Sequence, residues 1–167
     1  GKVSDFADNV GGTTIGRPYI SGEFHAANDV IAYTFGQADR PADLAITINK
    51  ETNVVTSLNE DILGHRKLGK VNEITYRSSF DGQEIQGWYI TPPDFNPKKK
   101  YPLILEIHGG PHLAYGPHFS AELQIMAASG YIVFYDNYRG SSSYGEDFAL
   151  LLQYKYSSKE DFADHMS

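Results

Sequence analysis

Leu103-Ile104-Leu105-Glu106-Ile107-His108-Gly109-Gly110-Pro111-His112 is the stretch that decides the fold of this chain. Its first five residues are typical of a buried strand, and their continuous apolar character predicts a central strand covered on both faces. Two glycines directly after a strand let the backbone turn sharply and approach a ligand closely. We therefore expect the backbone N–H groups of Gly109 and Gly110 to face a cleft, where such donors stabilise the oxyanion of an acyl-transfer reaction.

The segments around this stretch predict an α/β sheet. Val71–Arg77 and Glu84–Ile90 have the composition of two strands, and an Asp-Gly pair between them is a hairpin signal. Ser120–Ser129 predicts a helix, and Tyr131–Asp136 predicts the strand that follows it. The order of three strands, a helix and a further strand is typical of the beginning of an α/β sheet.

The predicted helices have recognisable faces and ends. Leu123, Met126 and Ala127 recur at helical spacing, so we expect this face of the first helix to pack against the sheet. Two later segments, Tyr144–Tyr156 and Ser158–Met166, also have helical composition, and the serine that opens the second is a suitable N-cap.

The first third of the chain predicts short antiparallel strands of the kind that form a β-propeller blade. These strands are expected at Tyr19–Phe24, Asn28–Phe35, Asp43–Asn49 and Asn53–Leu58. No second copy of the pattern is visible, so a single blade would lack its neighbours. Residues 59–70 form a polar connector, and we expect two units, residues 1–69 and residues 70–167.

Composition excludes several classes of function. The chain has 167 residues and a formal net charge of −7, which argues against a nucleic-acid surface and against binding to anionic membranes. It contains no cysteine, which excludes disulfides, thiolate metal sites and a cysteine nucleophile. No apolar stretch approaches the roughly 20 residues that span a bilayer. The chain begins at Gly1 rather than Met, so we expect processing or a piece of a longer protein, and the compartment stays open.

Two loop motifs carry a family resemblance. The turn His108–His112, with Tyr115-Gly116 after it, precedes a second loop at Asn137–Gly145, which reads Asn-Tyr-Arg-Gly-Ser-Ser-Ser-Tyr-Gly. In this combination and order, the chain resembles the prolyl oligopeptidase family of serine peptidases, and most of all its acylaminoacyl-peptidase branch. The resemblance implies a β-propeller that caps an α/β-hydrolase domain, with residues 1–69 containing the last blade and residues 70–167 the N-terminal part of the hydrolase sheet.

The resemblance also implies roles for individual residues. An His-Gly-Gly turn after the third strand is the donor loop of α/β-hydrolases. The N–H of Gly110, supported by Gly109, would then form part of the oxyanion hole, and the second donor would be the N–H after the nucleophile. His108 would position the loop rather than act as the catalytic base, and Arg139 would brace the second loop. No cofactor or metal is implied, and the substrate would be a peptide.

The chain departs from the family pattern at the nucleophile. A nucleophile elbow reads G-x-S-x-G, and the nearest approach, Gly140–Tyr144, has tyrosine where the second glycine belongs. In the family, the nucleophilic serine and the triad Asp and His follow the point that Ser167 occupies here. We therefore expect a part of a hydrolase that does not turn over substrate alone.

Simpler interpretations compete at each candidate residue. His108, His112 and His118 invite a zinc site, but their spacing provides no helical pair, which favours loop-bracing or surface histidines. For the serines at 141–143, a role in loop capping is favoured over that of a nucleophile, because the sequence identifies no base for them. For Arg139, a structural role as a brace is favoured over binding of a substrate carboxylate. We expect the acidic residues to form the first turn and the solvated face of a helix; they are Glu160, Asp161 and Asp164.

Two other functions remain open at this level. A non-catalytic interaction fragment would use exposed strand edges to associate with a missing half or with a second copy. An esterase would use the same oxyanion loop, because that loop does not distinguish an ester from an amide.

Overall fold

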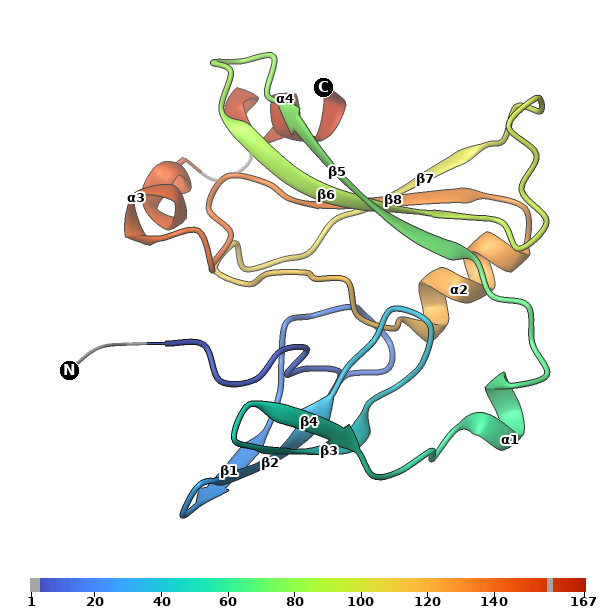
Figure 1. Ribbon diagram of the computed structural model, residues 1–167. Coiled ribbons are helices and arrows are strands. Elements are labelled where there is room, and N and C mark those ends of the chain that lie inside the picture. The colour runs from blue at the N-terminus through green and yellow to red at the C-terminus, as the bar shows by residue number, and fades with distance from the viewer. Residues whose placement is uncertain (1–3, 156–157) are drawn as a thin grey trace.

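The computed structural model describes residues 4–155 and 158–167, and it contains two sheets that follow one another along the chain (Figure 1). The first sheet is antiparallel in the order of the sequence, and its strands are β1 (Phe24–Ala27), β2 (Val30–Phe35), β3 (Asp43–Ile48) and β4 (Glu51–Val54). The second sheet has the order β5-β6-β8-β7, and its strands are β5 (Lys70–Arg77), β6 (Glu84–Thr91), β7 (Leu103–Glu106) and β8 (Ile132–Asn137).

The helices are short. They are α1 (Glu60–Leu63), α2 (Ala121–Ala128), α3 (Glu146–Ala149), a 3-10 turn (Leu150–Leu152) and α4 (Lys159–Met166). No helix of the described residues has the length and apolar content needed to cross a membrane.

The first sheet confirms the predicted strands around residues 30–35 and 43–48, because polar turns separate short alternating segments. In β3, the side chains of Ala45 and Thr47 are buried while those of Leu44 and Ile48 are exposed, as period-2 alternation requires. The predicted strand at Asn53–Leu58 is wrong in its extent, since β4 ends at Val54.

The end of β4 has a local cause. The hydroxyl of Thr56 donates to Asp43 and accepts from the N–H of Leu44, both at 2.8 Å, so this side chain replaces backbone pairing. The outer strand predicted at 19–24 is also wrong, because Tyr19 forms an isolated bridge with Tyr115 and β1 begins only at Phe24.

The second sheet mixes both strand directions. The antiparallel hairpin of β5 and β6 confirms the Asp-Gly signal, β6 pairs with β8 antiparallel, and β7 pairs with β8 parallel. Helix α2 covers one face of this sheet with Leu123 and Ala127, which are fully buried, and with Met126 at the margin, as predicted. The core between the helix and the sheet consists of Trp88, Ile90, Tyr115, Leu123, Ala127, Val133 and Tyr135.

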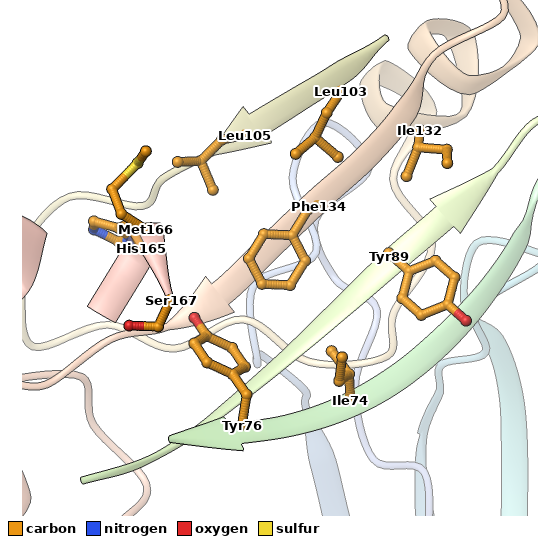
Figure 2. Close-up of a pocket in the computed structure, with 10 residues that line it drawn as sticks. All are labelled: Ile74, Tyr76, Tyr89, Leu103, Leu105, Ile132, Phe134, His165, Met166 and Ser167. Atoms are coloured by element: carbon orange, nitrogen blue, oxygen red, sulfur yellow. The ribbon is translucent and has the colours of Figure 1, made fainter. Parts of the chain in front are cut away.

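The prediction that β7 is a central, doubly covered strand is wrong. In the described residues β7 lies at the edge of the sheet order, and Leu103 is 62% exposed. Because side chains alternate along strands, the residues that face away from α2 gather on the other face, where they line an open apolar groove of about 610 Å³. Figure 2 shows this face; the lining residues are Ile74, Tyr76, Tyr89, Leu103, Leu105, Ile132, Phe134, His165, Met166 and Ser167.

The helix predicted over Tyr144–Tyr156 is also wrong in its extent. Helix α3 covers only four residues and continues into the 3-10 turn, and Tyr154 adopts a positive φ of 63° that an α-helix does not allow. Tyr156 lies outside the described residues. The cap predicted for the last helix is confirmed, because the hydroxyl of Ser158 accepts from the N–H of Glu160.

An N-terminal strap, which we define as residues 9–20, joins the two sheets. Its second half runs beside residues 114–121, where the N–H of Gly116 donates to Pro18 (2.9 Å) and that of Ile20 donates to Ala114 (2.9 Å). Arg17 forms ion pairs with Glu106 and Glu122, on β7 and on α2.

Gln124 on α2 holds the connector that leads from the first sheet to β5. Its side-chain oxygen accepts from the N–H of Gly69 at 2.7 Å, and its amide donates to the carbonyl of Gly69 at 3.0 Å. Both residues are buried, so the side chain satisfies both backbone groups of the connector.

We expect Gln124→Met to destabilise the chain by about 1–3 kcal/mol, because a side chain of similar shape leaves the N–H and C=O of Gly69 buried without partners. Chemical denaturation followed by circular dichroism measures this difference. Gln153→Met, at an exposed position, is the matched control. Equal effects of the two substitutions would contradict the assigned role of Gln124.

Candidate active site

The candidate site lies where two neighbouring strands end. Strands β7 and β8 are parallel and paired, so their carboxyl ends meet at the same edge of the sheet. The turn 108–111 follows β7 shortly after its end, and the loop 138–144 follows β8 directly. The two motifs that the sequence places 30 residues apart are therefore adjacent in space.

The diglycine turn leaves its amides available. Gly109 and Gly110 are exposed, and within the part of the chain that the structure describes, neither N–H donates to another protein group. Gly110 has φ of +129°, which L side chains rarely adopt, and a Cβ at this position would lie 2.8 Å from the backbone nitrogen of His112. Position 110 therefore requires glycine for its conformation and for its space.

His108 connects the turn after β7 to the loop after β8. Its ring is buried, Nε2 lies 3.0 Å from the hydroxyl oxygen of Ser141, and its carbonyl accepts a hydrogen bond from the Tyr138 hydroxyl at 2.9 Å. The ring packs against those of Tyr115 and Tyr138, at 5.0 and 4.9 Å between centroids. Burial lowers the pKa of His108, so the ring is neutral near pH 7.

The Ser141–His108 contact has the composition of a nucleophile and its base, but its surroundings do not suit that role. Ser141 is completely buried, and its hydroxyl also donates to the carbonyl of Tyr138 at 2.6 Å. A hydroxyl that is held in this way has no path to a substrate carbonyl. The contact therefore fastens the loop after β8 to the turn after β7.

Arg139 holds the same loop from the other side. Its guanidinium forms a two-point contact with Asp164, with Nε–Oδ2 at 2.9 Å and Nη2–Oδ1 at 2.8 Å. It also donates to Asp81 in the β5–β6 turn, at 2.9 and 3.1 Å, and to the hydroxyl of Ser78. The side chain of Arg139 is only 3% exposed. With these partners its charge is already paired inside the protein.

The charges in this cluster stabilise one another. The hydrogen bond to Asp164, followed by that to Asp81, raises the pKa of Arg139 further above its usual value. The hydrogen bond from Arg139 is the main cause that lowers the pKa of Asp81. The hairpin, the end of β8 and helix α4 are thereby tied to one guanidinium.

Asp164 corrects one expectation from the sequence. The sequence predicts it on a solvated helix face with Glu160 and Asp161, and this is wrong. Asp164 is completely buried against Arg139, whereas Phe162 on the same helix is 65% exposed. The polarity of α4 is thus inverted with respect to an ordinary surface helix. No local pattern announces this, because the partner lies 25 residues earlier in the sequence.

Asn137 is a second residue whose role the sequence did not reveal. Its buried side-chain oxygen accepts from the N–H of Tyr115 at 2.8 Å, and its amide donates to the carbonyl of Tyr115 and to the hydroxyl of Tyr144, each at 2.8 Å. The amide is fully used, and it fixes the segment after the diglycine turn to the end of β8.

The histidines considered for zinc lie in different surroundings. His108 is buried between tyrosines, His112 is exposed, and His118 is buried beside the N-terminal strap. Across residues 4–155 and 158–167, no three His, Cys, Asp or Glu side chains are grouped so as to hold a metal ion.

We expect Asp164→Ala to cost about 3–5 kcal/mol of stability, because it leaves a buried guanidinium with only part of its charge compensated. Asp161→Ala, on the first turn of the same helix, should cost less than about 1 kcal/mol. Urea unfolding of both variants measures the contrast. Similar losses in the two variants would show that Asp164 has no special role.

Comparison with known proteins identifies relatives with peptidase names. Residues 117–167 match the model of the prolyl oligopeptidase family. The chain is 38% identical over 129 residues to the uncharacterized peptidase YuxL of Bacillus subtilis (strain 168), which covers 77% of this chain and 19% of that protein. It is 34% identical over 122 residues to dipeptidyl-peptidase 4 of Giardia intestinalis, covering 71% of this chain and 16% of that protein. The chain thus spans about a fifth of the length of these relatives.

A solved structure agrees with the sequence matches. The acylaminoacyl peptidase of Pyrococcus horikoshii superposes with a TM-score of 0.76 at 35% sequence identity, over 86% of this chain and 23% of that one. The two loops, their positions on neighbouring strands and these similarities lead to the same assignment. The chain belongs to the prolyl oligopeptidase family.

Proposed function

We propose that this chain is the oxyanion-binding part of a serine peptidase, and that the N–H of Gly110, supported by that of Gly109, stabilises the developing negative charge of a peptide carbonyl. The observation that carries the proposal is the pair of exposed amides without a protein acceptor among the described residues. Rigid donors of this kind contribute to catalysis because they are oriented before the charge develops.

The surrounding contacts supply the rigidity that such donors need. His108, Asn137 and Arg139 each use buried hydrogen bonds to fix one side of the two loops. None of the three has a free group directed at a substrate, so we assign them positioning roles. A neutral, enclosed His108 is unsuited to serve as the base that accepts the serine proton.

The nucleophile would come from outside these 167 residues, since the sequence contains no G-x-S-x-G pentapeptide. Its hydroxyl would attack the peptide carbonyl and form an acyl-enzyme, while a histidine base accepts the proton and passes it to the leaving amine. The N–H after that serine would be the second donor to the oxyanion. The names of the relatives, which are peptidases and a dipeptidyl-peptidase, support a peptide as the substrate.

In the same proposal, residues 1–69 contain one propeller blade with its connector, and residues 70–167 contain the first strands of the α/β-hydrolase sheet. The four-stranded antiparallel order of the first sheet supports the blade. The order β5-β6-β8-β7, with one parallel pair and α2 on one face, supports the hydrolase sheet.

A non-catalytic interaction role is the second candidate, and the exposed groove beside β7 favours it. A sheet face with aromatic and aliphatic side chains in contact with water favours association. We expect the 167-residue chain to self-associate in size-exclusion chromatography with light scattering at micromolar concentration. A monomer that keeps its fold would remove the support for this candidate.

The peptidase proposal is tested in the longer natural protein that contains this sequence. We expect a fluorophosphonate probe to form one serine adduct, and Gly110→Ala to lower kcat about a hundredfold or more on aminoacyl anilides with a smaller change in KM. Gly130→Ala is the matched control, because Gly130 also has a positive φ but has free space around it at the end of α2. An unchanged kcat for Gly110→Ala would refute the oxyanion role.

Comparing p-nitrophenyl esters with aminoacyl anilides separates the esterase alternative. Activity on the esters alone would identify an esterase on this fold, and the absence of any probe adduct would exclude a serine hydrolase.

A further inference from the structure

His118 lies where the segment before α2 meets the N-terminal strap and the end of β2. It lies in the loop before α2, is 8% exposed, and packs against glycines from three parts of the chain. A side chain on Gly11 would overlap the imidazole ring, and a Cβ on Gly36 would lie 2.9 Å from its Nδ1. A Cβ on Gly116 would lie 3.2 Å from its Cδ2. The ring therefore fills a space that exists because these residues lack side chains.

The backbone around the ring holds the N-terminal strap to the first sheet. The N–H of Gly11 donates to Thr34 at 3.0 Å, and the N–H of Gly36 donates to Asn9 at 2.8 Å. His118 covers this pair from the side of the second sheet. It thus contacts the strap, the end of β2 and its own loop at once.

The ring is suited to the neutral form only. Nδ1 is buried and has no hydrogen-bond partner among the described residues. Burial lowers the pKa of His118, and no charged side chain of residues 4–155 and 158–167 contributes to that change. The glycines that line the ring carry no ionisable group. At the other end of the strap contact, the charged side chains are Arg17, Glu106 and Glu122, and Arg17 forms an ion pair with each glutamate.

We propose that His118 makes the contact between the N-terminal strap and the loop before α2 acid-sensitive. The protonated ring carries a hydrogen on both nitrogens, and the Nδ1–H then lies in a space where the described residues offer no acceptor. Burial of an unpaired charged donor is unfavourable, so the protonated ring favours an open arrangement in which water reaches it. This inference is independent of the proposed peptidase activity.

The direction of the pH effect follows from linkage. The pKa of His118 is lower in the closed chain than in the open one, so the open chain binds more protons as the pH falls. The contact keeps its full stability above the ordinary histidine pKa of about 6.5 and loses it progressively below that value. At pH 5.5, an open-state ring with the ordinary pKa favours opening by at most about tenfold, the limit reached when the closed-state ring stays neutral. Carboxylates ordinarily titrate below this range.

Hydrogen exchange of the 167-residue chain at pH 7.5 and 5.5, corrected for intrinsic rates, tests the proposal. We expect protection of the amides of Gly11, Gly36, Gly116 and Ile20 to fall severalfold, at most about tenfold, at pH 5.5, while amides of the β6–β8 ladder change less. His118→Phe keeps a buried ring that cannot titrate, and should keep protection at both pH values. His112→Gln, at an exposed position in the same loop, should behave like the parent chain.

A second measurement on the parent chain keeps the test decisive if His118→Phe does not fold. Nuclear magnetic resonance follows the His118 ring and the strap amides through one pH titration. We expect both to change at the same midpoint. A ring that titrates without any change in the strap amides, or strap amides that lose protection equally in His118→Phe, would overturn the proposal.

Discussion

The parallel pairing of β7 with β8 is the constraint on which the site depends. Because both strands run in the same direction, their carboxyl ends lie at one edge of the sheet, and the two loops that follow them become neighbours. An antiparallel arrangement would send the loops to opposite ends of the sheet. The crossover through α2 makes the parallel pair possible, and it also covers one face with Leu123 and Ala127.

Buried polar contacts support the diglycine turn, whose amides are exposed. His108, Asn137 and Arg139 satisfy their own groups inside the protein, and together they hold the backbone on both sides of the turn. Buried polar networks of this kind are stabilising when every member is paired, and they allow one backbone conformation. The N–H groups of the two glycines can therefore stay exposed to solvent while the backbone of the turn keeps its position.

Local pattern predicts a large part of this fold. The β5–β6 hairpin, the buried face of α2 and the Ser158 cap follow from short-range signals, because neighbouring residues determine them. The edge position of β7 does not follow, since an apolar run has the same composition at the centre and at the margin of a sheet. The contact between Asp164 and Arg139 depends on how α4 returns to β8, and no spacing within either segment encodes it. The sequence therefore locates the glycines of the site, while the supports beneath them require the structure.

The interlocking of the two loops limits how their lengths can vary. The hydroxyl of Tyr138 donates a hydrogen bond to the carbonyl of His108, and the side chain of Asn137 bonds both backbone groups of Tyr115. These bonds fix the position of each loop relative to the other. One inserted residue in either loop would shift these partners by about 3.5 Å, more than a hydrogen bond tolerates. Residues 94–100, between β6 and β7, are exposed, and within the described residues they form no hydrogen bond to either of these two loops. Evolutionary insertions and deletions should accordingly concentrate in that loop and spare the paired loops at the sheet edge.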